Sequence, residues 1–202
     1  MNTRKLMNDV IALEWEMFSS VPNSGRRAAC QMDGNTFRAV RASQLCEWPR
    51  TLLTSYRNDL TAAKSQDRNL MTEKYAWMME STFPAEFLRI AHLLPEIDKD
   101  TLARIDEIVS VNVVWELAVC EKYPKLGQRG RPVYTFEDSE SETSFETYLR
   151  GELKTYSPAT ISELQEFTRS LKADSVNGVE RDLLYQVGWY GYSTLEQAEK
   201  NQ

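Results

Sequence analysis

Hydrophobic positions recur at spacings of three and four along most of the chain, which is the period of an amphipathic α-helix. The first such stretch contains Leu6, Val10, Leu13 and Met17. Proline, glycine and asparagine lie between the stretches, where they end helices and form turns. The pattern predicts helices over residues 3–20, 29–47, 49–63, 70–82, 84–94, 98–123, 144–156, 158–173 and 179–190, and a last helical turn in which Ser193 and Glu196 form a capping box.

Two segments need closer reading. The β-branched run at 109–114 resembles a strand when taken alone, but it lies inside the long helical period of residues 98–123, so we expect a helix there. Residues 127–143 show no period and end in an acidic run. We expect a long surface loop over this segment, placed to close over a site as a lid.

The predicted helices are uneven in length and interrupted at irregular intervals. A regular four-helix coiled bundle requires long helices of similar length, so this pattern does not fit one. We predict an all-α protein, an irregular orthogonal bundle of about eight to ten helices with one long loop around 127–143. With 202 residues, the chain is expected to form a single all-α domain over 1–202.

The charge balance narrows the class of partner. Asp and Glu number 30 against 24 Lys and Arg, a net charge of −6, which disfavours a nucleic-acid partner; such a partner would have to use Arg26, Arg27, Arg129 and Arg131. No apolar run approaches the length of a membrane span and no signal-peptide core is present, so no membrane association is expected. Three widely spaced cysteines indicate reduced thiols and a cytoplasmic location.

Several reaction types lack their usual residues. His92 is the only histidine, and the chain has neither the cysteine spacing of a zinc site nor a glycine-rich phosphate-binding loop. No metal site is therefore predicted. The cofactor, the reaction and the oligomeric state are left open.

The most informative pattern is a set of polar residues on an apolar helix face. In the predicted helix 29–47 and directly after it, one face carries Cys30, Asp33, Phe37, Arg41, Gln44 and Trp48. Burial of charged groups beside Phe37 and Trp48 is costly unless the charges pair or meet a ligand. Two interpretations stay open, an internal Asp33–Arg41 salt bridge that fixes the helix, and a ligand pocket.

The pocket interpretation gives a helical protein that binds a small, anionic molecule among aromatic side chains. Arg41, with Lys74 or Arg150, would hold the anion, and a buried carboxylate would act as acid or base if the protein is an enzyme, which is left open. The candidate catalytic residues are Glu14, Asp33 and Glu146. The candidate ligand-binding residues are Trp15, Asn23, Gln31, Phe37, Arg41, Gln44, Tyr56, Glu73, Lys74, Tyr148 and Arg150.

The alternative is a non-catalytic protein–protein interaction module. Its polar residues would form structural networks, and its working surface would be an exposed apolar or acidic patch. Met71, Met78 and Met79 would suit an adaptable partner surface, because methionine side chains are flexible.

Short sequence segments along most of the chain resemble those of a known protein family. They are Glu-Trp-Glu-Met-Phe at 14–18, Cys-Gln-Met-Asp at 30–33, Thr-Phe at 36–37, Arg-Ala-Ser-Gln at 41–44, Ser-Tyr at 55–56, Asp-Leu at 59–60, and the segments 68–76 and 143–150. In these blocks the chain resembles an uncharacterised bacterial family, domain-of-unknown-function family 4125. The resemblance implies a bacterial cytoplasmic protein and supplies no activity.

Overall fold

The computed structural model describes residues 2–22 and 28–202, and within these residues every regular element is a helix. The all-α, multi-helix prediction is therefore confirmed. The α-helices are α1 (Thr3–Ser19), α2 (Gly34–Leu45), α3 (Arg50–Ser65), α4 (Leu70–Thr82), α5 (Pro84–Ile90), α6 (Lys99–Lys122), α7 (Pro124–Gly127), α8 (Phe145–Leu153), α9 (Pro158–Ala173), α10 (Gly178–Trp189) and α11 (Leu195–Lys200). Short 3₁₀ turns are η1 (Ala29–Met32), η2 (Ala91–Leu93) and η3 (Thr135–Glu137).

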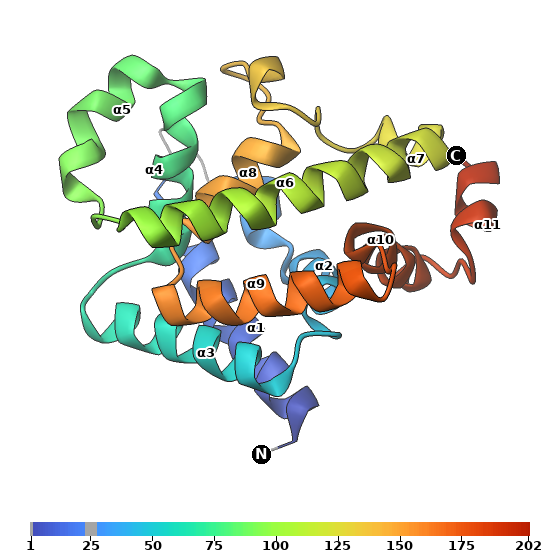
Figure 1. Cartoon of the computed structure of the whole chain (residues 1–202), viewed down its shortest axis with the longest axis horizontal. Coiled ribbons are helices and arrows are strands. Elements are labelled where there is room, and N and C mark those ends of the chain that lie inside the picture. Colours follow the sequence, from blue (N-terminus) through green and yellow to red (C-terminus); the bar gives the residue numbers. More distant parts are fainter. Residues whose placement is uncertain (1, 23–27) are drawn as a thin grey trace.

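The long helix α6 crosses the whole width of the molecule, and most other helices are arranged around it (Figure 1). On one side, α9 packs along α6, α3 packs on α9, and α1 packs on α3. At one end α4 packs against α8 and carries α5, while at the other end α10 packs against both α6 and α2. The uneven lengths predicted an irregular bundle, and the helices cross at varied angles in Figure 1.

The β-branched run at 109–114 is helical, as its surrounding period predicts. Asp98 begins α6, because its side chain accepts a hydrogen bond from the backbone N–H of Thr101 at 2.9 Å. The helix ends at Lys122, because its C-cap Tyr123 directly precedes Pro124 and a residue that precedes proline disfavours helical backbone. Ile105, Ile108 and other α6 side chains belong to the main apolar core.

Two apolar clusters hold the helices together. The larger one joins side chains of α1, α3, α4, α6, α8 and α9, among them Val10, Leu53, Tyr56 and Ile161, all fully buried. Each buried aliphatic side chain contributes about 1.5–3 kcal/mol through removal from water. A smaller cluster joins the end of α6 to α10 and α11 through Val119, Val187 and Ala198.

The predicted helix 29–47 is divided into η1 and α2 at Asp33. This residue has φ −106° and ψ 76°, which is not helical, and its carboxylate accepts a hydrogen bond from the backbone N–H of Thr36 at 3.0 Å. Asp33 is therefore the N-cap of α2. Asp favours caps because its short side chain competes for backbone N–H groups, so continuing the helix through Asp33 was wrong.

The predicted loop 127–143 is shorter and better anchored than expected. Its first residue belongs to α7, and η3 lies in its middle. The backbone N–H groups of Phe145 and Glu146 donate to the carbonyl groups of Pro132 and Val133, at 2.7 and 3.1 Å. These bonds fasten the segment to the start of α8.

The last helix also begins one residue later than predicted. Thr194 caps α11, because its hydroxyl accepts a hydrogen bond from the backbone N–H of Gln197 at 3.1 Å. The side chain of Gln197 in turn accepts from the backbone N–H of Ser193 at 2.9 Å. The reciprocal bonds resemble the predicted capping box, but Thr194 and Gln197 form them instead of Ser193 and Glu196.

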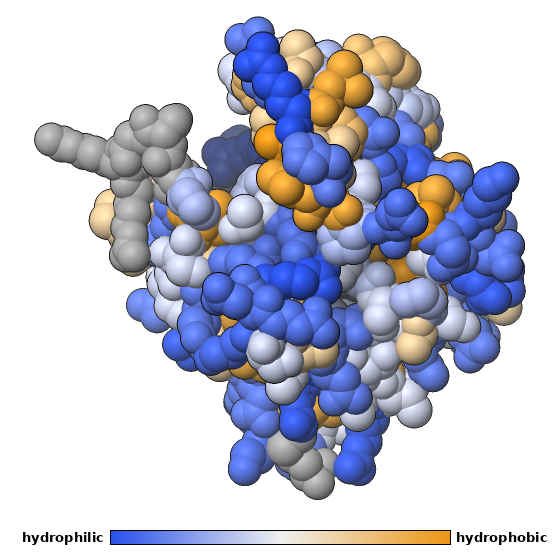
Figure 2. All heavy atoms as spheres, turned by 90° about the vertical axis from the view of Figure 1, so that its left-hand side faces the viewer, coloured by the Kyte–Doolittle hydropathy of each residue, from blue (hydrophilic) through white to orange (hydrophobic). Residues whose placement is uncertain are grey.

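A partner surface formed by methionine side chains would need these side chains to be exposed. Met71 and Met78 are 6% and 7% exposed and belong to the interior. Hydrophobic side chains gather instead around α5, at the top of the face in Figure 2, where Leu88 and Leu93 are exposed. No helix in residues 2–22 and 28–202 is both long and apolar enough to cross a membrane.

A glycine sets the close packing of α8 on α4. A Cβ atom at Gly151 would lie 2.8 Å from Cγ of Met78 and 3.1 Å from the carbonyl oxygen of Lys74. We expect Gly151→Ala to lower the free energy of unfolding by about 1–3 kcal/mol, because the backbone of α4 must move. Urea unfolding measures the change.

Gly188 provides the matched control, because a Cβ atom there would meet nothing within 4 Å. Gly188→Ala, in an exposed part of α10, is expected to stabilise the protein by about 0.5–1 kcal/mol through its better helix propensity. Equal effects of the two substitutions would contradict the close contact at Gly151.

Candidate functional site

A carboxylate lies in the middle of the apolar face of α1. Glu14 is fully buried, and the guanidinium of Arg41 from α2 binds it with two parallel hydrogen bonds. Nε of Arg41 donates to Oε2 at 2.8 Å, and Nη2 donates to Oε1 at 2.5 Å. The hydroxyl of Tyr56, from α3, donates to Oε1 at 2.7 Å. This bidentate geometry is the strongest form of a side-chain ion pair.

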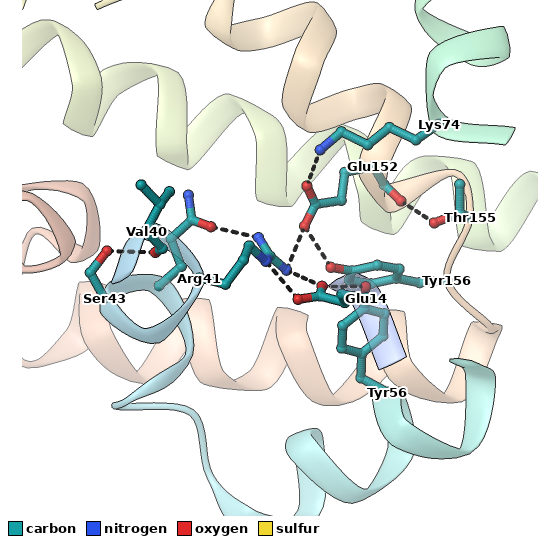
Figure 3. Close-up of polar contacts among 10 residues, drawn as sticks. Glu14, Val40, Arg41, Ser43, Tyr56, Lys74, Glu152, Thr155 and Tyr156 are labelled. Carbon is teal, nitrogen blue, oxygen red and sulfur yellow. Dashed lines mark hydrogen bonds and ion pairs between the residues drawn. The ribbon is translucent and has the colours of Figure 1, made fainter. Parts of the chain in front are cut away.

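A second carboxylate extends the pair into an alternating row. Oε1 of Glu152, from α8, lies 3.2 Å from Nη2 of Arg41, and Oε2 lies 2.5 Å from Nζ of Lys74. The hydroxyl of Tyr156 donates to Oε1 at 2.8 Å. Figure 3 shows Arg41 between the two carboxylates and Lys74 reaching Glu152 from the opposite side. We call Glu14, Arg41, Glu152 and Lys74 the charge quartet.

The charge quartet joins two basic and two acidic side chains, and electrostatic interactions shift the pKa values of several of its groups. Burial acts against the charge of Glu152, but Arg41 and Lys74 outweigh it and hold the pKa of its carboxyl far below the ordinary range. Burial likewise opposes the charge of Lys74, yet the carboxylate of Glu152 keeps the pKa of the ammonium raised. Burial beside these carboxylates also raises the pKa of Tyr56 and Tyr156, so both phenols stay protonated.

A cavity of about 440 Å³ borders the charge quartet, and we call it the α2–α4 cavity. Its walls carry the aromatic rings of Phe18, Phe37, Tyr75 and Tyr148. The Phe18 and Phe37 rings stack with their centroids 5.0 Å apart. Small-molecule sites are commonly cavities of this size, mostly apolar, with a few convergent polar groups.

Two cations converge on one aromatic ring in this wall. Nζ of Lys74 lies 3.5 Å from the centre of the Tyr148 ring, and the guanidinium carbon of Arg131 lies 4.3 Å from it. Nη1 of Arg131 donates to the carbonyl oxygen of Thr143 at 2.9 Å, and no carboxylate of the described residues forms an ion pair with Arg131. Arg131 is therefore a cation with unused donors at the cavity.

The polar face predicted around helix 29–47 lies beside cavities. Five of its six residues border the α2–α4 cavity, namely Cys30, Asp33, Phe37, Arg41 and Gln44. The predicted Asp33–Arg41 salt bridge is absent from the described residues, because Asp33 caps α2 and Arg41 pairs with Glu14 and Glu152. Cys30 and Asp33 are exposed, and the buried residues of α2 are Ser43 and Leu45, so the expected burial of the whole face was wrong, and Arg41 has other partners than the predicted Asp33.

The other sequence candidates fall into two groups. Lys74 and Tyr148 border the cavity, while Trp15, Gln31 and Tyr56 do not. Gln31 donates to the carbonyl groups of Phe18 and Val21, both at 3.0 Å, and Trp15 packs on Phe37 with ring centroids 5.3 Å apart. These contacts are structural.

The remaining candidates lie away from the cavity in ion pairs. Glu73 pairs with Arg68 at 2.7 Å, and Arg150 pairs with both Asp106 and Glu146. Glu146 also accepts a hydrogen bond from the backbone N–H of Thr135 at 3.1 Å, which holds η3 in place. Asn23 lies outside the described residues.

Sequence reasoning missed five residues of the site, Phe18, Tyr75, Arg131, Glu152 and Tyr156. The sequence contained a signal for Glu152 and Tyr156. They follow the candidate Tyr148 at spacings of four in the predicted helix 144–156, which places all three on one helix face. Arg131 gave no such signal, since its segment has no period. Within the described residues, no group of three or more His, Cys, Asp or Glu side chains is placed to hold a metal ion.

Fold and site together define an all-α protein with a buried charge quartet beside an aromatic cavity. The chain belongs to a family described as protein of unknown function (DUF4125), whose model matches residues 4–200. This confirms the resemblance noted from the sequence blocks. Comparison with curated proteins gave no match, and comparison with solved structures gave none either.

Removal of one carboxylate tests the charge quartet. We expect Glu152→Gln to lower the free energy of unfolding by about 3–5 kcal/mol, because Lys74 and part of Arg41 lose their counter-charge in the interior. Urea unfolding measures it. The surface pair of Glu107 and Arg169, with Nε and Oε1 at 2.6 Å, supplies the control, and Glu107→Gln is expected to change stability little. Equal effects would show that burial adds nothing to the quartet.

The effect of Glu152→Gln should also depend on pH. The carboxyl of Glu152 has its pKa lowered from an ordinary 4.5 on folding, so its contribution is complete above 4.5 and is lost as the pH falls toward the lowered value. The difference in unfolding free energy between wild type and variant should therefore shrink below pH 4.5. Urea unfolding over an acidic pH series measures it, and a constant difference would contradict the lowered pKa.

Proposed function

We propose that this protein binds a small organic anion in the α2–α4 cavity. The observation that carries the proposal is the convergence of Lys74 and Arg131 on the Tyr148 ring in the cavity wall. Both cations border the same cavity, so an anion bound there would be attracted by two positive charges. The stacked rings of Phe18 and Phe37 suit the apolar or aromatic body of such a ligand.

Both cations keep donors free for a ligand. An ammonium group has three N–H donors, and Lys74 gives one of them to Glu152. Arg131 gives Nη1 to the carbonyl group of Thr143, which leaves Nε and Nη2 available. Asp33 also borders the cavity, but its carboxylate accepts hydrogen bonds from both the backbone and the hydroxyl of Thr36 at the N-terminus of α2. The positive end of α2 offsets that charge.

Arg41 has a supporting part in this proposal. Its Nε, Nη1 and Nη2 atoms donate to Glu14 and Gln44, and Nη2 also lies 3.2 Å from Glu152. A side chain committed in this way positions Glu152, and through it Lys74, instead of gripping the ligand itself. The sequence hypothesis gave Arg41 the anion, and the contacts favour Lys74 and Arg131.

The proposal is binding and contains no acid–base step. Glu14 does not border the cavity, and Glu146 is engaged with Arg150 and Thr135. Hydrogen bonds from Thr36 lower the pKa of Asp33, and Arg41 with Lys74 lowers that of Glu152 against the effect of burial, so neither carboxylate is a strong base. A general base near neutral pH needs a pKa close to 7.

Phenyl phosphate is a suitable probe, because it joins an anion to an aromatic body. We expect it to bind the wild-type protein, and Arg131→Gln to weaken that binding by roughly tenfold through loss of a charge-assisted contact. Isothermal titration calorimetry measures both affinities. Arg129→Gln is the matched control, since Arg129 is exposed on the same segment and borders neither cavity, and it should bind as the wild type does.

Two further comparisons make the result decisive. Benzyl alcohol, which has the ring without the anion, should bind much more weakly than phenyl phosphate. Arg131→Gln should leave the midpoint of thermal unfolding unchanged, because Arg131 is exposed. Equal binding of phenyl phosphate by wild type and Arg131→Gln, or no binding by either, would overturn the proposal.

A further inference from the structure

A second cavity, of about 340 Å³, lies between α6, α9 and α10, and we call it the α6–α10 cavity. Arg41, Gln44, Arg131, Tyr148 and Glu152 border both cavities, so part of the charge quartet forms the wall between them. Most of the other lining is apolar. The lining also includes Trp48, Trp115, Glu116, Arg181 and Asp182.

Two carboxyl groups that border the α6–α10 cavity have no ion-pair partner among the described residues. The side chain of Asp182, on α10, forms no hydrogen bond and no ion pair with another described residue, and the charges of Arg181 and Arg41 act on it without direct pairing. Glu116, on α6, has one contact of this kind, a weak one from the thiol of Cys120 at 3.9 Å. Both residues are partly buried and border the cavity, so a cation bound there would meet carboxyl groups that no ion pair engages.

The charged groups around Asp182 are already matched to other residues. Arg181 pairs with Glu47 at 3.5 Å, and Arg41 pairs with the carboxylates of the quartet. The thiol of Cys46 also faces Asp182 and is neutral, since burial raises its pKa to about 11. Nε of Arg181 is buried without a hydrogen-bond partner, which is further unused polar capacity on the same wall.

We propose that the α6–α10 cavity binds an organic primary amine, whose ammonium group pairs with the carboxylate of Asp182 and whose apolar body lies against Trp48 and Trp115. Indole rings attract cations through their faces, and they also provide a large apolar surface. Glu116 supplies a second negative charge at the same cavity. This site differs from the anion site of the α2–α4 cavity, and either one can fail without the other.

The proposal predicts that protons are released on binding. Burial raises the pKa of Asp182 from an ordinary 3.8 to about 8, against the opposing effects of Arg181 and Arg41, so this carboxyl is mostly protonated at pH 7. An ammonium ion needs the ionised carboxylate, so Asp182 must give its proton to the solvent when the amine binds. Affinity should therefore increase several-fold between pH 7 and pH 8.5, while the amine itself stays protonated.

Phenethylamine is the probe, and isothermal titration calorimetry at pH 7 in two buffers of different ionisation enthalpy is the measurement. We expect binding with a release close to one proton, seen as a buffer-dependent heat. The neutral analogue 2-phenylethanol should bind at least roughly tenfold more weakly. If 2-phenylethanol binds as well as phenethylamine, the cavity recognises only the apolar body and the proposal is wrong.

Asp182→Asn keeps the shape and removes the charge. We expect it to weaken phenethylamine binding at least roughly tenfold and to abolish the proton release. Asp174→Asn, at the exposed C-cap of α9, is the matched control and should behave as the wild type. Unchanged affinity in Asp182→Asn would overturn the proposal, as would the absence of phenethylamine binding to the wild type.

Glu116→Gln gives an independent check if Asp182→Asn folds poorly. Glu116 contributes charge without direct pairing in this proposal, so its variant should bind phenethylamine several-fold more weakly and still release a proton. Loss of the proton release in Glu116→Gln would place the titrating group at Glu116 and contradict the role of Asp182.

Discussion

Four charged side chains from four helices meet in the interior with alternating signs, and the arrangement of the surrounding helices depends on this charge quartet. Glu14 comes from α1, Arg41 from α2, Lys74 from α4 and Glu152 from α8. Removal of any one charge leaves its neighbours uncompensated away from water, which costs far more than the loss of a surface pair. The quartet therefore requires these four helices to keep one relative position.

The same constraint shapes both cavities. Side chains that are fixed by buried ion pairs cannot rearrange to fill the space beside them, so cavities next to the charge quartet keep their walls. Arg41 and Glu152 border both the α2–α4 cavity and the α6–α10 cavity. Gly151, directly before Glu152, lets α8 approach α4 closely enough for Glu152 to reach Lys74. A rigid wall of this kind gives a binding site at a low entropic cost, which is the advantage of preorganisation.

The two proposed sites lie on the two sides of that wall and take ligands of opposite charge, an anion in the α2–α4 cavity and an ammonium ion in the α6–α10 cavity. Arg131 and Lys74 offer unused donors to the α2–α4 cavity, while Asp182 and Glu116 leave unpaired carboxyl groups at the α6–α10 cavity. The exposure of Leu88 and Leu93 around α5 is separate from both cavities. In the two proposals these unpaired groups bind ligands, whereas an interaction module based on surface contacts would not use them.

The sequence alone determined most of the helices, because they depend on local period: residues 70–82 and 158–173 have the predicted bounds. The polar face from Cys30 to Gln44 borders a cavity, but Cys30 and Asp33 are exposed, so the period did not determine which of its residues are buried. Local caps shifted the rest, as Asp33 and Thr194 show. Only the tertiary structure decided the ion pairs, since Glu14 and Arg41 are 27 positions apart and Lys74 and Glu152 are 78 apart. A periodic pattern shows which side of a helix is inside, but helix packing decides which charge lies opposite.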